Sequence, residues 1–364
     1  MENRRAEQHQ NTVMGGPLSN EAKNRIHQTL QETLEKELTH AQQTLNLGGI
    51  KARARGPWTM LNGDGGGWAE TTRLSRELFA QIKGQFSDDI AREILLAAAG
   101  VKVSRTSLCE AKLGLLRSIA AQHDFCILAS ADRYIFRRDK GKGGCCNAIE
   151  RVAGPDEDSG LRIVYMASEP SLAEAAKLLE EAGDDQLFGM LLGIPSCCRE
   201  AYARFQPMAI AKQFDLVPMV LDNTTGEMPY DPWVNYPAVY FGRALLSFFP
   251  CSFRCPAAGI VARRTFEMLA ECDAAWARSF LDFQQTNILY TEYQGVHMFR
   301  CPIIDGSIRY EPSDLHSTEP TDLAAVLRSG DRLWVHGKRQ VDIYRGMERI
   351  AVLEGEDVGV CAFR

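Results

Sequence analysis

The sequence is organised by two short stretches, Pro195-Ser196-Cys197-Cys198-Arg199-Glu200 and Pro250-Cys251-Ser252-Phe253-Arg254-Cys255-Pro256. Each stretch lies where a loop is predicted to turn into a helix, and the final proline of the second suits the first helical position. Thiols at a helix N-terminus have a lowered pKa and favour the thiolate, the form that binds metal or attacks as a nucleophile. Four such thiols in two matching settings predict one shared site.

The predicted metal ligands are the four thiols Cys197, Cys198, Cys251 and Cys255. Thiolates suit an iron–sulfur cluster, iron, zinc or copper(I). Neither pair has the Cys-x-x-Cys spacing of a structural zinc knuckle. Two alternatives stay open: buried helix-start cysteines with no shared role, and a metal-free site in which one thiol attacks and another resolves. A third adjacent pair, Cys145-Cys146, is a candidate extra ligand or resolving thiol, against a strand-start pair without a role.

Other candidate residues lie close to the motifs in the sequence. Arg199 is a candidate anion clamp and Glu200 a candidate acid/base, against plain helix-start roles for both. The aromatic and proline-rich stretch 230–237 could line a pocket for a cofactor or substrate. Trp233 and Tyr236 would be its walls and Asn235 its polar anchor, against an ordered surface loop.

Two histidines outside the polar N-terminal segment, His123 and His297, are candidate ligands or general bases, but a structural role is favoured for each. The sequence contains no His-Glu-x-x-His and no Gly-x-Ser-x-Gly, which argues against a zinc hydrolase of that type and against a serine nucleophile elbow.

The 364 residues are 45% hydrophobic and 24% charged, an ordinary globular composition with length enough for two domains. The net charge of -6 gives no basic footprint, so no nucleic-acid partner is expected. The sequence has no apolar signal region and no run of roughly 18 apolar residues, which predicts a cytoplasmic protein without membrane contact. Disulfides are rare in that compartment. Five isolated cysteines are therefore expected to be small buried hydrophobic residues: Cys109, Cys126, Cys272, Cys301 and Cys361.

The apolar patterns predict an α/β fold of the α+β kind, in four parts. Residues 1–18 are expected to be a disordered tail, and residues 19–122 a helical region with helices near 69–84, 87–99 and 105–122. Residues 123–297 are predicted to be an α/β core that carries the cysteine site. Residues 298–364 are predicted to form a small β-rich module of short strands split by turns.

Within the predicted α/β core, period-two and buried apolar runs indicate a mixed central sheet, with strands near 125–129, 134–136, 148–152 and 161–166. A helical cysteine-bearing part follows. Its apolar runs predict helices at 238–249 and 256–283, before and after the second motif.

Three segments together resemble a family of uncharacterised prokaryotic proteins known only as a domain of unknown function: residues 193–202, 235–237 and 249–255. The family pattern is Gly-aromatic-Pro-x-Cys-Cys followed by Pro-Cys-Ser-x-x-Cys, and the match covers about residues 185–270. The family often has a histidine shortly before the second Pro-Cys, where this chain has Ser247-Phe248-Phe249. The resemblance implies a shared cysteine site and no particular chemistry.

The leading hypothesis is a cytoplasmic metalloenzyme for redox or sulfur chemistry on a small-molecule substrate, with an iron–sulfur cluster or iron held by the four cysteines. A second hypothesis is a metal-free enzyme with Cys198 or Cys251 as nucleophile, its pKa lowered by Arg199 and Arg254. A third is a non-enzymatic binding protein with structural zinc.

Overall fold

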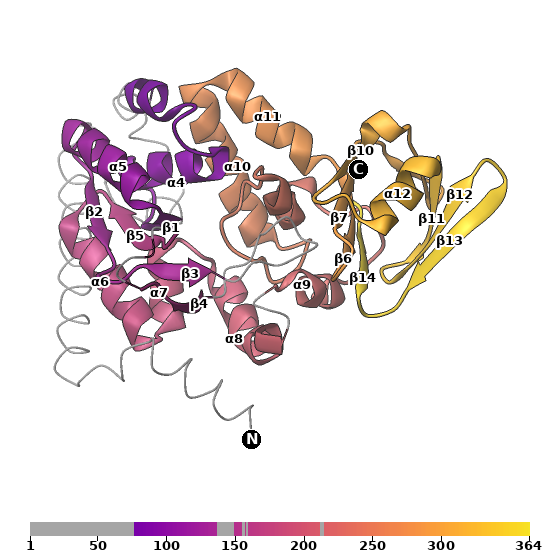
Figure 1. Cartoon of the computed structure of the whole chain (residues 1–364), viewed down its shortest axis with the longest axis horizontal. Coiled ribbons are helices and arrows are strands. Elements are labelled where there is room, and N and C mark those ends of the chain that lie inside the picture. The colour runs from indigo at the N-terminus through magenta and orange to yellow at the C-terminus, as the bar shows by residue number, and fades with distance from the viewer. Residues whose placement is uncertain (1–75, 137–148, 155–156, 158, 212–214) are drawn as a thin grey trace, which may run out of the picture. The chain divides into compact units, whose positions relative to one another are not determined.

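The computed structural model describes residues 76–136, 149–154, 157, 159–211 and 215–364 (Figure 1). Unit 1 contains residues 1–136 and 149–194, and unit 2 contains residues 137–148 and 195–364. The predicted tail at 1–18 and the Cys145-Cys146 pair lie outside the described residues. Both units contain helices and antiparallel sheets, which confirms the predicted α+β class. Among the described residues, no helix combines the length and apolar character that a membrane span requires.

Unit 1 is built on a three-stranded sheet in the order β1-β5-β2. β5 (Arg162–Ala167) is central, because it pairs with β1 (Ser104–Leu108) on one side and β2 (Cys126–Ala129) on the other. Its burial on both faces fits this central place. The other elements are a helical segment at 76–82, α4 (Asp88–Ala98), α5 (Glu110–His123), α6 (Pro170–Ala182), α7 (Asp185–Leu191) and the antiparallel pair β3 (Tyr134–Phe136) and β4 (Ile149–Val152).

β1 occupies the start of the segment predicted as a helix at 105–122, so that prediction is wrong over residues 105–108. Its hydrogen-bond partner is β5, far along the chain, and local propensity carries no information about such a partner. The helix begins only at Glu110 and ends where Asp124 adopts a left-handed backbone, with φ of 53°. Every pairing between the strands named here is antiparallel, so the central sheet is antiparallel and not mixed.

A cluster of three buried charges ties α4 to the segment before β1. Lys102 Nζ lies 2.6 Å from Glu93 Oε2, and Arg92 Nη2 lies 3.0 Å from Glu93 Oε1. Burial alone would raise the pKa of Glu93, but the charges of Lys102 and then Arg92 lower it to about 2. The carboxylate is therefore ionised at neutral pH and balances cations that are themselves buried.

The helices of unit 2 carry both cysteine motifs. α8 (Ser196–Ala211) begins at the first motif, and α10 (Pro256–Cys272) begins directly after the second. The remaining helices of the unit are α9 (Val217–Asn223), η1 (Pro232–Val234), η2 (Tyr236–Phe241), α11 (Ala274–Gln284), η3 (Pro312–Asp314) and α12 (Asp322–Ser329).

Two predicted helices of unit 2 differ from the structure. In the segment predicted as a helix at 238–249, only the short η2 forms, because Gly242 turns the chain with a φ of 68°. The helix predicted at 256–283 is two helices, α10 and α11. Asp273 separates them with an extended backbone, and its carboxylate accepts a hydrogen bond from the Trp276 N–H at 2.9 Å, which caps α11.

Unit 2 contains two antiparallel sheets, in the orders β10-β7-β6-β14 and β13-β12-β11-β9-β8. The short strands predicted within residues 298–364 are present, and Figure 1 shows β12 and β13 as a long hairpin. The last strand, β14 (Val358–Cys361), pairs with β6 (Asn287–Thr291), so the β-rich part begins before the predicted boundary at 298. The remaining strands are β7 (Val296–Phe299), β8 (Ile303–Ile304), β9 (Ser307–Arg309), β10 (Leu315–Ser317), β11 (Arg332–Gly337), β12 (Gln340–Arg345) and β13 (Glu348–Glu354).

His297 on β7 is a buried structural residue. Its Nδ1 lies 2.9 Å from Ser317 Oγ, and its Nε2 lies 3.0 Å from the carbonyl oxygen of Gln294. Burial lowers the pKa of His297 from 6.5 to about 4. The imidazole is therefore neutral at physiological pH. Its two hydrogen bonds stabilise the sheet, in agreement with the favoured prediction of a structural role.

The low pKa of His297 makes the stability of unit 2 depend on pH. Between pH 6.5 and pH 4 the unfolded chain binds more protons at this residue than the folded chain, so stability falls as the pH falls through that window. The expected loss between pH 7 and pH 5 is about 2 kcal/mol in the free energy of unfolding, measured by urea titration of tryptophan fluorescence. A His297→Gln variant has no proton to bind there and should lack this part of the slope. An unchanged slope would contradict the assignment.

Candidate metal centre

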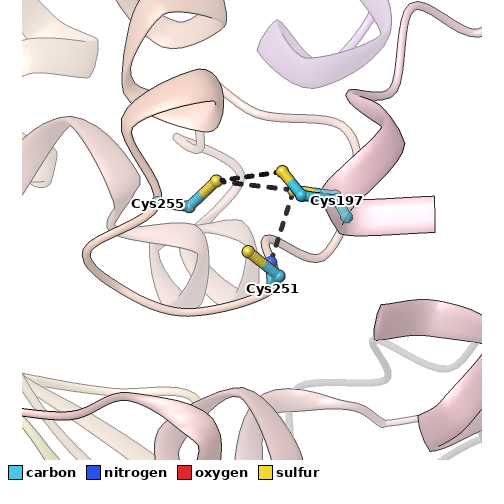
Figure 2. Close-up of side chains that lie close together, drawn as sticks. Cys197, Cys251 and Cys255 are labelled. Carbon is cyan, nitrogen blue, oxygen red and sulfur yellow. Dashed lines mark hydrogen bonds between the residues drawn. The ribbon is translucent and has the colours of Figure 1, made fainter. Parts of the chain in front are cut away.

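Four cysteine sulfurs from two separate segments of unit 2 lie together (Figure 2). The Sγ of Cys255 lies 3.7 Å from the Sγ of Cys197 and 3.7 Å from that of Cys198, and the latter two lie 3.9 Å apart. When the sulfur of Cys251 is included, all four sulfurs lie within 4.8 Å of one another. The predicted convergence of the two motifs is confirmed, and the distances are compatible with metal binding.

The first turn of α8 supplies two of the four thiols. The carbonyl of Pro195 accepts hydrogen bonds from the N–H groups of Cys198 and Arg199, at 2.9 and 3.0 Å, which fixes where the helix starts. Successive helical residues point about 100° apart. Cys198 consequently faces inward, with 1% of its surface exposed, whereas Cys197 is exposed.

The other two thiols flank a short loop that leads into α10. Cys255 is the residue before the helix, and its Sγ accepts a hydrogen bond from the Ala258 N–H at 3.4 Å. Pro256 occupies the first helical position, as predicted. The N–H of Cys251 donates to the Sγ of Cys198, also at 3.4 Å. Each of the two buried sulfurs thus accepts one backbone donor, which stabilises a thiolate there.

The loop that carries Cys251 is anchored by the end of α9. Asn223 Nδ2 donates to the carbonyl of Cys251 at 2.7 Å, and the N–H of Phe253 donates to Thr224 Oγ1 at 2.9 Å. Such outer contacts orient metal ligands. Sequence reasoning missed both residues, because a side chain that holds a distant backbone leaves no periodicity or spacing to detect.

Phe253, in the middle of the same loop, anchors it by packing into an aromatic cluster. Its side chain is fully buried, and its ring centroid lies 5.9 Å from that of Tyr230 and 5.4 Å from that of Phe363. The N–H of Tyr230 donates to the carbonyl of Ala362 at 2.7 Å. The cysteine loop therefore rests on an aromatic cluster that includes residues close to β14.

Arg254 serves the scaffold of the loop. Its guanidinium donates to the carbonyls of Glu227 and Pro229 and lies over the ring of Tyr230, 5.7 Å from the centroid. These contacts give Arg254 a structural role, and its suggested effect on the pKa values of the thiols remains a prediction. On α8, Arg199 is half-buried and Glu200 is exposed, so their suggested roles as anion clamp and acid/base remain predictions.

The thiols shift the pKa values of one another. The pKa of Cys255 is lowered to about 2, first because the thiols of Cys198 and Cys251 donate to it, and further by the N–H of Ala258. The pKa of Cys198 is raised by its hydrogen bonds with Cys251 and Cys255 and by burial. For Cys251, the hydrogen bond from Cys198 lowers the pKa, but the bond to Cys255 and burial outweigh it and raise the pKa to about 12. Burial raises the pKa of Cys197. Without a cation, Cys255 is therefore the residue of the four that most favours the thiolate.

The side-chain nitrogen of Asn235 makes structural contacts, and the suggested role of Asn235 as a polar anchor remains a prediction. It is fully buried, and its Nδ2 lies 3.2, 3.0 and 3.2 Å from the carbonyl oxygens of Phe283, Gln284 and Thr286. Phe283 and Gln284 are the last two residues of α11 and Thr286 follows it, a place where backbone acceptors lack helical partners. The amide nitrogen thus caps α11 from outside.

The two aromatic residues predicted as pocket walls make packing contacts. The ring of Trp233 lies 5.6 Å from that of Phe266 and under the guanidinium of Arg263, at 5.3 Å. Tyr236 is buried, with its ring centroid 4.4 Å from that of Phe249, just before the second motif. Both rings therefore support the segments around the cysteine loop.

The isolated cysteines are buried to different degrees. Cys361 is fully buried, as expected of a small hydrophobic residue. The other four are partly buried: Cys109, Cys126, Cys272 and Cys301.

Comparison of the chain with protein-family models, with curated proteins and with solved structures gave no match. The resemblance of residues 185–270 to an uncharacterised family therefore remains a prediction. The chemistry of the cluster has to be argued from its own geometry.

Proposed function

We propose that unit 2 is a metal-binding module whose four cysteines hold one ion in a tetrahedral set of thiolates. The observation that carries this proposal is the spacing of the sulfurs, with Sγ–Sγ distances of 3.7, 3.7 and 3.9 Å. A tetrahedron with metal–sulfur bonds of 2.3 Å has edges of about 3.8 Å. The thiols of Cys197, Cys198 and Cys255 thus already lie at the separations that one bound ion requires, and the sulfur of Cys251 lies within 4.8 Å of theirs.

The same distances favour zinc over the iron–sulfur cluster that led the sequence analysis. In a four-iron cluster each thiolate binds a different iron atom, so the cysteine sulfurs lie farther apart than two ligands of one ion. Four thiolates around one ion are typical of structural zinc. A single iron accepts the same donor set and is the second candidate.

The donor set also bears on what the ion does. Four protein ligands complete a tetrahedron and leave no open position for a substrate, unlike a catalytic zinc site with three. The ion would join the starts of α8 and α10 to the loop at residues 251–255. The proposed role is therefore to stabilise a binding module, in place of the redox enzyme expected first.

A metal-free nucleophile finds less support. Of the two predicted nucleophiles, Cys198 is 1% exposed and has a raised pKa, and the pKa of Cys251 is about 12. The thiolate of the cation-free cluster sits on Cys255, which is 2% exposed. A thiolate must be accessible to attack, and this one is covered.

The proposal predicts one zinc ion per chain with proton release on binding. Because three of the thiols have raised pKa values, zinc must displace roughly three protons, so its apparent affinity rises with pH. Metal analysis of desalted protein, with titration of the metal-free form in weakly buffered indicator, measures both. A brown protein with iron and sulfide would instead indicate a cluster, and protein that retains no metal would refute the proposal.

A further inference from the structure

The four thiols of the proposed metal centre are not equivalent. Cys198 and Cys255 are buried, and each sulfur accepts a hydrogen bond from a backbone N–H. Cys197 is exposed, and among the described residues its recorded partners are only the sulfurs of the cluster. A hydrogen bond to sulfur occupies a lone pair and lowers its nucleophilicity, and burial blocks approach.

Metal binding adds a second asymmetry. An ion that binds all four cysteines holds each of them as a thiolate at neutral pH. Burial and backbone donors then protect Cys198 and Cys255 from a reagent in solution, while Cys251 is partly buried within its loop. In the described part of the chain neither Cys197 nor Cys251 has a backbone donor to its sulfur, and Cys197 is the more exposed residue of the two.

We propose that metal-bound Cys197 is an acceptor of small alkyl groups from soft electrophiles, such as a methyl group on a good leaving group. This inference rests on the proposed metal site. The thiolate lone pair of Cys197 forms the new sulfur–carbon bond, the bond from carbon to the leaving group breaks, and the leaving group departs with its electron pair. The product is a thioether, no redox change occurs and no further reactant is needed.

The position of Cys197 in the fold supports a role of this kind. Its neighbour Cys198 faces the interior with Ala201 and Phe205, one and two turns on, so this face of α8 is buried. Cys197 faces the same way as Glu200 and Arg204, which are exposed. A reagent can therefore approach its sulfur from the solvent side of α8, while the other three thiolates keep the ion in place.

The test treats zinc-loaded protein with methyl iodide and follows each cysteine by peptide mass spectrometry. Cys197 is expected to gain a methyl group at least about tenfold faster than Cys198, Cys251 or Cys255. Zinc content is measured on the same sample. Zinc present without this preference overturns the inference alone, whereas absence of zinc overturns both it and the proposed function.

A matched variant separates reactivity from folding. Cys197→His retains three cysteines and one histidine, a donor set that binds zinc tetrahedrally. The variant is expected to keep one zinc per chain and to lose the fast methyl uptake. If it keeps zinc and still takes up methyl at the centre as fast as the parent protein, Cys197 is not the acceptor. If it loses zinc, the parent's labelling pattern decides alone.

Discussion

A Cys198→Ser variant is expected to lose its zinc ion and the stability that the ion gives to unit 2. Cys198 is the most buried thiol of the centre, and its sulfur contacts those of both Cys197 and Cys255. A serine hydroxyl stays protonated at neutral pH and is a poor ligand for zinc in place of thiolate. At free zinc about a thousand times the Kd, the metal contributes about 4 kcal/mol to the free energy of unfolding, which the variant forfeits.

The measurements are zinc per chain and urea unfolding, each with and without zinc. The matched control is Cys361→Ser, because Cys361 is an equally buried thiol of the same unit outside the metal centre. That control should lose the unfolding free energy that burial of a hydroxyl costs, and it should keep its zinc. The two variants are expected to differ when zinc is present and to converge when it is chelated. A Cys198→Ser protein with one tightly bound zinc would refute the shared site.

Unit 1 is expected to lose about 3–5 kcal/mol of stability in a Glu93→Gln variant. The substitution removes the carboxylate that pairs with both Arg92 and Lys102, and both of these cations are buried. Desolvation already lowers the pKa of Lys102 beside an intact Glu93. Removal of the anion takes away the attraction that offsets part of the cost of burying these two positive charges.

Hydrogen exchange followed by mass spectrometry measures this loss region by region. Peptides from α4 and β1 should exchange faster in Glu93→Gln, while peptides from unit 2 serve as an internal reference. Glu157→Gln is a useful comparison, because the pKa of Glu157 is also lowered to about 2, mainly through Arg151. That pair lies at the surface, where solvent screens it, and little change is expected. Equal effects of the two substitutions would contradict the assignment.

The cysteine centre could be predicted from the sequence because its signals are local. A proline, one or two thiols and the start of an apolar helical pattern stand within a few residues at each motif. Backbone donors at a helix start favour thiolates wherever the helix lies. Two such starts therefore indicated one site before their convergence was known, and the sulfurs of Cys197 and Cys255 do meet.

The predictions of secondary structure and contacts failed or were incomplete where segments far apart in the sequence interact. Residues 104–108 are a strand only because β5 lies beside them, and the strand β14 leaves its neighbouring hairpin to pair with β6. Asn235 lies in an aromatic-rich segment, and its side-chain nitrogen donates to a carbonyl at the end of α11. The sequence around Asn235 contains no sign of this distant partner. The sequence also did not identify the metal, because the choice between zinc and a cluster depends on the distances between the sulfurs. The positions of the cysteines in the sequence do not specify these distances.

The aromatic support of the cysteine loop has a consequence for how the protein is made. Phe253 packs against Phe363, and the N–H of Tyr230 bonds to the carbonyl of Ala362. A ribosome delivers the N-terminal part of a chain first. All four cysteines are therefore synthesised well before Phe363. Until then, the nascent chain carries them without the aromatic cluster that supports their loop. The loop at residues 251–255 therefore reaches its final packing only after residues 362–363 have been synthesised, so the proposed ion would be held securely only from that point.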